Sequence, residues 1–161
     1  MTLSGALAGG FTGTLLLTTV LRAASELRLT RIDLPFLLGT VVTGHRPRAK
    51  AIGYAAHFGF GLLFATGYYA IFAAVGRAGW LLGAGLGLLH GVFASTALVN
   101  LLLPLIHPRM GSPLSTIESR ALLEPPGFLL INYGMQTPLV TFVAHLAYGA
   151  LVGGFAALSR V

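Results

Sequence analysis

Three histidines lie inside long apolar stretches of the sequence, at His57, His90 and His145. A neutral imidazole binds zinc, copper and iron, and it also donates or accepts hydrogen bonds and takes up a proton near neutral pH. If the apolar stretches cross a bilayer, a histidine is costly to place against lipid, and such residues usually face the inside of a helix bundle. The three histidines are therefore the first candidates for a functional site.

Small residues share a helical face with each of these histidines. They are Gly53 and Gly61 for His57, Gly83, Gly87 and Ala94 for His90, and Thr141, Gly149 and Gly153 for His145. Because small residues at this spacing let helices approach closely, we expect all three histidines to face neighbouring helices. The segments HFGFG and HLAYG also share a histidine, two residues, an aromatic residue and a glycine. That pattern is typical of either an internal duplication or similar packing.

The composition places the chain in a membrane. Of its 161 residues 55% are hydrophobic and 9% are charged, and the mean hydropathy is +0.84. A soluble surface carries far more charge, and a helical span needs roughly 20 apolar residues. Four apolar stretches meet this length, at about residues 3–27, 51–75, 80–106 and 138–158. We predict one all-α domain, a polytopic membrane protein built as an up-down bundle of four transmembrane helices.

The distribution of Lys and Arg predicts the orientation, because these residues are retained on the cytoplasmic side. The two long loops, residues 28–50 and 107–137, contain Arg28, Arg31, Arg46, Arg48, Lys50, Arg109 and Arg120. Only Arg77 and Arg160 mark the other side. We therefore expect both long loops in the cytoplasm and both termini outside. The net charge of +6 fits contact with anionic lipid headgroups, and we expect no nucleic-acid binding.

Each long loop contains a short apolar segment, at residues 34–42 and 121–135. Neither segment is long enough to cross a bilayer, so each is expected to lie in the interface or to re-enter. Two interpretations stay open for them: an interfacial linker, or a lid over a cavity that opens to the cytoplasm. At the same surface we interpret His45 and His107 as ordinary solvated histidines.

Counting about 1.5 Å per residue along each span predicts the depth of the polar groups. The count places His57 and His145 in the cytoplasmic half of the membrane and His90 slightly outside the midplane. Most glycines of the spans fall in the outer half. We therefore expect a bundle that is tightly packed outside and wider inside, with the polar side chains around the wider part. Besides the histidines, the residues assigned to this cavity are Thr18, Thr19, Tyr54, Asn100 and Thr141.

Several segments together resemble a known family. The run HFGFGLLFATGYYAIFAAVG is followed by GAGLGLLHGVFAS, then by the proline-containing exit LLLPLIHP and the final helix motif AHLAYG. In the order of the histidines and their flanking glycines, residues 51–158 resemble the uncharacterised bacterial inner-membrane proteins of the YagU type. The resemblance implies a four-helix, multi-pass protein of the bacterial inner membrane, and it implies no reaction.

Three functions remain open at this point. In the first, His57, His90 and His145 bind a transition metal or a haem, and the diagonal placement of spans two and four would let His57 and His145 supply both axial ligands. In the second, the cavity binds or transports a small molecule or lipid, and transport would require a homo-oligomer. In the third, the protein is an accessory or scaffold subunit of a larger membrane complex, and the histidines are structural contacts between helices.

The sequence assigns no reaction and no catalytic residue. Motifs for nucleotide binding, for serine or cysteine nucleophiles and for zinc hydrolases are absent from it. The chain has no cysteine, which excludes thiolate ligands and disulfides. Whether the protein is an enzyme stays open, and a cofactor is unassigned beyond haem or a transition metal. The expected partners are the lipid bilayer, further copies of the chain or a larger membrane complex.

Overall fold

The computed structural model describes residues 1–110 and 123–159. Within them the chain is built from helices, with a single β-bridge between Met110 and Leu123. The elements are α1 (Leu3–Glu26), α2 (Leu34–Gly39), α3 (Arg46–Val75), α4 (Trp80–Phe93), the π-helix η1 (Ala94–Leu102), α5 (Leu103–Ile106), the 3₁₀-helix η2 (Phe128–Tyr133) and α6 (Thr137–Leu158). Some residues named above lie outside the described residues: Arg120, Arg160 and residues 121–122 of the second apolar loop segment.

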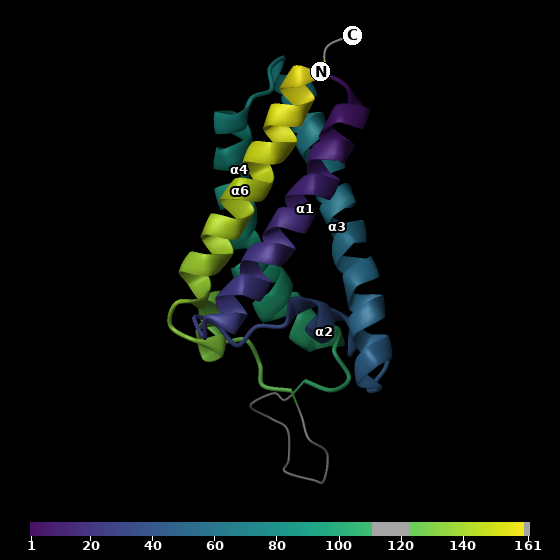
Figure 1. The fold of residues 1–161 in the computed structure, drawn as a ribbon, viewed down its shortest axis with the longest axis vertical. Helices are drawn as coiled ribbons and strands as arrows, with labels where there is room; N and C mark the ends of the chain where they lie inside the picture. The colour runs from purple at the N-terminus through teal and green to yellow at the C-terminus, as the bar shows by residue number, and fades with distance from the viewer. Residues whose placement is uncertain (111–122, 160–161) are drawn as a thin grey trace.

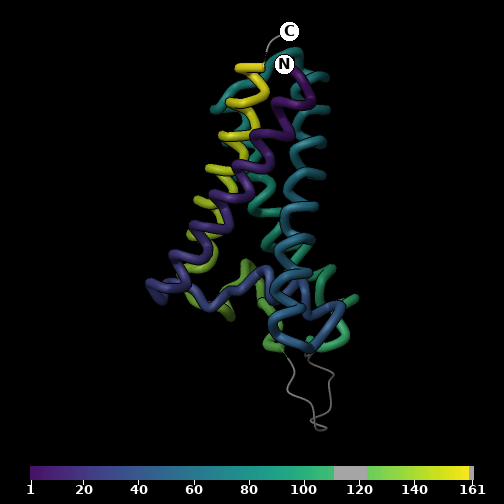
Figure 2. Tube along the Cα trace, turned by 45° about the vertical axis from the view of Figure 1, so that its right-hand side comes forward, coloured from purple at the N-terminus to yellow at the C-terminus, as the bar shows by residue number. Residues whose placement is uncertain are grey.

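Four helices are long and apolar enough to cross a membrane. They are α1, α3, the continuous helix Trp80–Ile106 made of α4, η1 and α5, and α6. The prediction of an all-α protein with four membrane spans is confirmed, and the chain is a multi-pass membrane protein. Figure 1 and Figure 2 show both termini at one end of the bundle and α2 at the opposite end.

The helix α6 packs tightly between α1 and α4, and glycines make both contacts possible. A Cβ atom added at Gly83 of α4 would lie 2.1 Å from the carbonyl oxygen of Gly149 on α6, and one at Gly87 would lie 2.2 Å from that of His145. On the other side of α6, a Cβ at Gly9 of α1 would lie 2.8 Å from the carbonyl oxygen of Leu151. The backbones therefore touch where a larger residue would separate them.

The helix α3 stands apart from α4 and α6. It packs along α1, where a Cβ added at Gly61 would meet Thr14, and it packs against α2. Its backbone has few close neighbours on α6. Figure 1 shows α1 and α3 close together near the termini and spread apart toward the other end, where α2 lies. The backbone of α3 therefore lies against α1 and α2 and away from those of α4 and α6.

The third span changes from α- to π-helix at Ala94, and the local sequence explains the change. The hydroxyl of Ser95 donates to the carbonyl oxygen of Gly91 at 2.8 Å, and that of Thr96 donates to the carbonyl of Val92 at 2.6 Å. These hydroxyls compete with the backbone N–H groups that normally bind the same carbonyls. Farther along, Pro104 supplies no N–H at all. The helix therefore has a wider turn between these two points, as π-helices do.

The helix α2 lies between the ends of α1 and α3 and is fixed against α3. The Oδ1 atom of Asp33 accepts a hydrogen bond from the N–H of Phe36 at 3.1 Å and so caps the start of α2. At Gly39, an added Cβ would lie 1.6 Å from the carbonyl oxygen of Ala49 on α3. This close contact places α2 across the space that α1 and α3 leave between them.

We expect the glycine contacts between α4 and α6 to decide the stability of the bundle. Gly87→Ala forces the two backbones apart and should cost roughly 1–3 kcal/mol of stability, as other overpacking substitutions do. Gly85→Ala on the same helix is the matched control, because its added Cβ meets nothing within 4 Å. The control should be neutral or slightly stabilising, since alanine favours a helix more than glycine does. Thermal unfolding in detergent measures both variants, and equal melting temperatures would contradict this packing.

Candidate ligand-binding cavity

A cavity of about 380 Å³ lies between α3 on one side and the third span and α6 on the other. Apolar side chains from α1, α2, α3, η1 and α5 form most of its wall. The polar side chains in the wall are Thr14, His57, His90, His145 and Tyr148. Leu34 and Leu38 of α2 also line the cavity, so α2 closes it at the end away from the termini.

His90 is the centre of an aromatic cluster at the cavity wall. Its ring lies 3.9 Å from the ring of Phe64 and 4.9 Å from the ring of His145, measured between centroids. The hydroxyl of Tyr68 lies 3.3 Å from its Nδ1 atom, within hydrogen-bonding distance. His90 comes from α4, whereas Phe64 and Tyr68 come from α3. The cluster therefore bridges the two helices whose backbones are separated by the cavity.

Hydrogen bonds fix the orientation of the two polar groups contributed by α6. The Nδ1 atom of His145 lies 2.8 Å from the carbonyl oxygen of Thr141, and a carbonyl only accepts, so this nitrogen carries the hydrogen. The Nε2 atom of the neutral ring is then an acceptor. The hydroxyl of Tyr148 donates to the carbonyl oxygen of Gly61 on α3 at 2.5 Å. The buried Nε2 atom of His57 has no hydrogen-bond partner among the described residues.

The cavity opens sideways, between α3 and the span formed by η1 and α5. Its lining includes Phe60 and Leu63 of α3 and Leu102 and Ile106 of the third span, and all four side chains are exposed on the surface of the chain. In a multi-pass protein this surface faces the acyl chains of the bilayer. The opening therefore connects the cavity to lipid.

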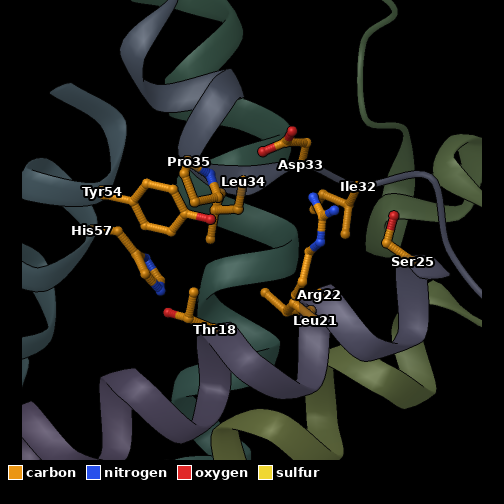
Figure 3. A pocket seen from close by; sticks show the side chains of 10 residues that line it. All are labelled: Thr18, Leu21, Arg22, Ser25, Ile32, Asp33, Leu34, Pro35, Tyr54 and His57. Atoms are coloured by element: carbon orange, nitrogen blue, oxygen red, sulfur yellow. The ribbon is translucent and has the colours of Figure 1, made fainter. Parts of the chain in front are cut away.

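A second, smaller pocket of about 40 Å³ lies between α1, the start of α2 and α3. Figure 3 shows Thr18, Arg22 and Ser25 of α1 on one side of it, Tyr54 and His57 of α3 on another, and Ile32 to Pro35 above them. The imidazole of His57 is directed toward Thr18. Leu34 and His57 line both this pocket and the large cavity, so the two spaces adjoin.

The structure brings some of the residues assigned from the sequence together and leaves others apart. All three intramembrane histidines line the large cavity, and Thr18 and Tyr54 line the small pocket. Three residues line neither space. Thr141 is buried behind His145, Thr19 lies on an exposed face of α1, and Asn100 lies in η1.

Two of the histidines are in a contact that the sequence did not predict. The structure places the rings of His90 and His145 in contact. Gly87 and Gly91 of α4 explain this contact, because added Cβ atoms there would meet the carbonyl oxygen and the Cβ of His145. The glycines thus set the register of α4 against α6 and bring the two rings to one level. The grouping of His57 with His145 by depth stays a prediction.

The sequence did not identify Thr14, Phe64 and Tyr148 as wall residues, or Tyr68 as a partner of His90. The shared pattern in HFGFG and HLAYG offered a signal for two positions, since Phe60 and Tyr148 are its aromatic residues and both line the cavity. The pattern therefore marks two helices that present an aromatic residue to the same space. It does not distinguish duplication from similar packing.

No group of three His, Cys, Asp or Glu side chains that could hold a metal ion occurs within residues 1–110 and 123–159. The geometry therefore gives no support to a metal site made by the three histidines. Comparisons of the chain with protein-family models, with curated proteins and with solved structures find no match. The resemblance to YagU-type proteins stays a prediction.

His107 was interpreted as a solvated residue, and this is wrong, because it is only 5% exposed. Its Nε2 atom lies 3.1 Å from both the hydroxyl of Thr40 and the carbonyl oxygen of Leu37, at the end of α2. Its Nδ1 atom accepts a hydrogen bond from the N–H of Arg109 at 3.1 Å. The guanidinium of Arg109 donates to the carbonyl oxygen of Thr40 at 2.6 Å. This network ties the end of the third span to α2, which closes the cavity.

We expect acid to weaken this network. Burial lowers the pKa of His107, the hydrogen bond to Leu37 opposes that change, and the charge of Arg109 lowers the pKa further. The unfolded chain, in which the histidine pKa is about 6.5, then binds the proton more readily than the folded protein. The stabilisation is therefore complete above about pH 6.5 and is lost as the pH falls below it.

Melting temperatures between about pH 7.5 and 5 measure this loss. The wild-type protein should lose stability more steeply on acidification than His107→Gln, which has no titrating group at this position. His45→Gln is the matched control, because His45 is exposed at the start of α3, and it should keep the wild-type slope. The interpretation fails if His107→Gln keeps the wild-type slope as well.

Proposed function

We propose that this protein binds a lipid or another largely apolar small molecule that reaches the cavity from the bilayer. The observation that carries the proposal is the cavity itself: about 380 Å³, mostly apolar, and open sideways beside Phe60 and Leu63. Cavities of this size are typical of small-molecule sites, which combine an apolar lining with a few polar groups. The lateral opening suits a molecule that is dissolved in the membrane.

The polar wall residues give this site its chemical preference. His145 presents an acceptor nitrogen, because its other ring nitrogen donates to the carbonyl of Thr141. The ring of His90 lies beside it. A ligand that fills the apolar part and carries a hydroxyl or another donor near these rings would satisfy them. Pure hydrocarbon would leave the acceptor nitrogen of His145 without a partner at membrane depth, which is unfavourable.

We also propose the orientation of the protein, as a protein of the bacterial inner membrane. The end of the bundle at α2 and η2 would face the cytoplasm, and both termini would face outward. The basic residues at this end support the orientation, by the tendency of Lys and Arg to stay on the cytoplasmic side. They are Arg28 and Arg31 after α1, Arg46, Arg48 and Lys50 at the start of α3, and Arg109 after α5.

Tryptophan fluorescence can test the binding of lipid in the cavity. Trp80, the only tryptophan, lies at the start of α4 and does not line the cavity. In the variant Trp80→Phe with Phe60→Trp, the tryptophan stands in the cavity wall. Titration of this variant in detergent micelles with a phospholipid brominated on its acyl chain should give saturable quenching. In the wild-type protein, quenching of Trp80 should only rise gradually with the lipid content of the micelle, without saturating.

A filled cavity provides the matched control for this experiment. Ala94→Leu adds a larger side chain to the cavity wall and should weaken the saturable phase about tenfold, since overpacking costs roughly 1–3 kcal/mol. Ala97→Leu makes the same change on the same π-helix outside the cavity lining and should have no effect. The proposal is refuted if quenching at position 60 never saturates. An absorption spectrum with a Soret band would replace it with a haem site.

Cysteine labelling can test the proposed orientation, because the chain has no native cysteine. In intact cells, Arg77→Cys in the short loop between α3 and α4 should react with an impermeant maleimide. Arg48→Cys at the start of α3 should react only after the cells are permeabilised. The reverse pattern would overturn the orientation, and both residues lie at exposed positions, so failure to label reports sidedness rather than burial.

A further inference from the structure

We propose that the small pocket binds the phosphate of an anionic phospholipid whose acyl chain lies in the large cavity. The inference rests on the proposed function and names its ligand class. Its basis is that the two spaces adjoin at Leu34 and His57, so one molecule can occupy both. The small pocket of about 40 Å³ has room for a few water-sized groups, as a phosphate requires.

The small pocket gathers hydrogen-bond donors from two helices. The guanidinium of Arg22 and the hydroxyl of Ser25 come from α1, and the hydroxyl of Tyr54 and the imidazole of His57 come from α3. An anion accepts from all of these groups, and the guanidinium can contact a phosphate with two N–H groups at once. The donor set therefore suits a phosphate better than an uncharged headgroup.

The charged groups around the pocket leave Arg22 available to a phosphate. Arg22 forms an ion pair with Glu26, one helical turn away, and both side chains are more than half exposed. Such a pair contributes little and can be exchanged for another anion. Asp33, the only acidic side chain in the lining, caps α2 and lies 3.0 Å from the ammonium of Lys50. Its negative charge is thus already compensated.

The position of the pocket along α1 fits a lipid headgroup. Arg22 lies one helical turn before the end of α1, about 6 Å from it at the rise of an α-helix. The large cavity extends from there toward the middle of the membrane, where His90 and Tyr148 lie. A lipid with its phosphate at Arg22 therefore keeps its charged group near the interface and its chain among apolar side chains.

The surrounding charge favours an anionic lipid over a zwitterionic one. The described residues at this end of the bundle include the basic side chains Arg22, Arg28, Arg31, Arg46, Arg48, Lys50 and Arg109, against the acidic side chains Glu26, Asp33 and Glu124. This excess attracts a net negative headgroup and repels the choline of phosphatidylcholine. Phosphatidylglycerol is the probe that carries the required charge.

Competition in the fluorescence experiment tests this assignment on the full chain. Phosphatidylglycerol should displace the brominated lipid from the Phe60→Trp variant about tenfold better than phosphatidylcholine with the same chains, as one charge-assisted contact allows. Arg22→Gln should abolish this preference and retain the binding of phosphatidylcholine. Arg48→Gln, which removes the same charge from the same end outside both cavity linings, should keep the preference. Tyr54→Phe is a second pocket variant for the case that Arg22→Gln does not fold. It should reduce the preference for phosphatidylglycerol.

The outcomes separate the headgroup assignment from the proposed function. Equal displacement by the two lipids, with saturable quenching intact, overturns the phosphate site and leaves the cavity proposal standing. A preference that survives Arg22→Gln and Tyr54→Phe also overturns it. Glycerol 3-phosphate, which lacks acyl chains, should displace nothing, and displacement by it would assign the pocket to a soluble phosphate compound. Quenching that does not saturate with any lipid defeats the proposed function itself.

Discussion

The backbone contact of α6 with α1 and α4 is the constraint on which the rest of this structure depends. Gly83 and Gly87 bring α4 against α6 so closely that no side chain fits between them, and Gly9 does the same for α1. In lipid, helices gain little from burying apolar surface, so such close packing is a main source of association. With α6 enclosed on two sides, the backbone of α3 packs mainly along α1 and α2. The cavity is the space that this arrangement leaves open.

Polar side chains near the cavity also connect α3 to α4 and α6. Tyr148 of α6 donates a hydrogen bond to the backbone of α3, and His90 of α4 contacts Phe64 and Tyr68 of α3. These contacts fit the third function considered from the sequence, in which the histidines are structural contacts between helices. They leave the Nε2 atom of His145 as an acceptor that this role does not need. A purely structural function accounts for His90 better than for His145 and His57.

Hydropathy and small-residue spacing predicted the four spans, because both depend on local sequence alone. A count of depth could not predict the contact of His90 with His145, because such a count assumes that the spans start at common levels. The structure starts α3 at Arg46, and the glycines of α4 set the register of α4 against α6. His107 looked solvated beside Pro108, yet its partners lie on α2, far away in the chain. Contacts between distant segments cannot be read from local spacing.

The route of a ligand into the cavity follows from which boundaries are fixed. At its start α2 is capped by Asp33, which also pairs with Lys50 of α3, and at its end it is held by His107 and Arg109. Displacing α2 would break charged and buried hydrogen bonds at both ends at once, each costly to leave unmade. The opening between α3 and the third span is bounded instead by apolar side chains such as Leu63. These can change rotamer within nanoseconds, so access from the bilayer requires no rearrangement of a helix.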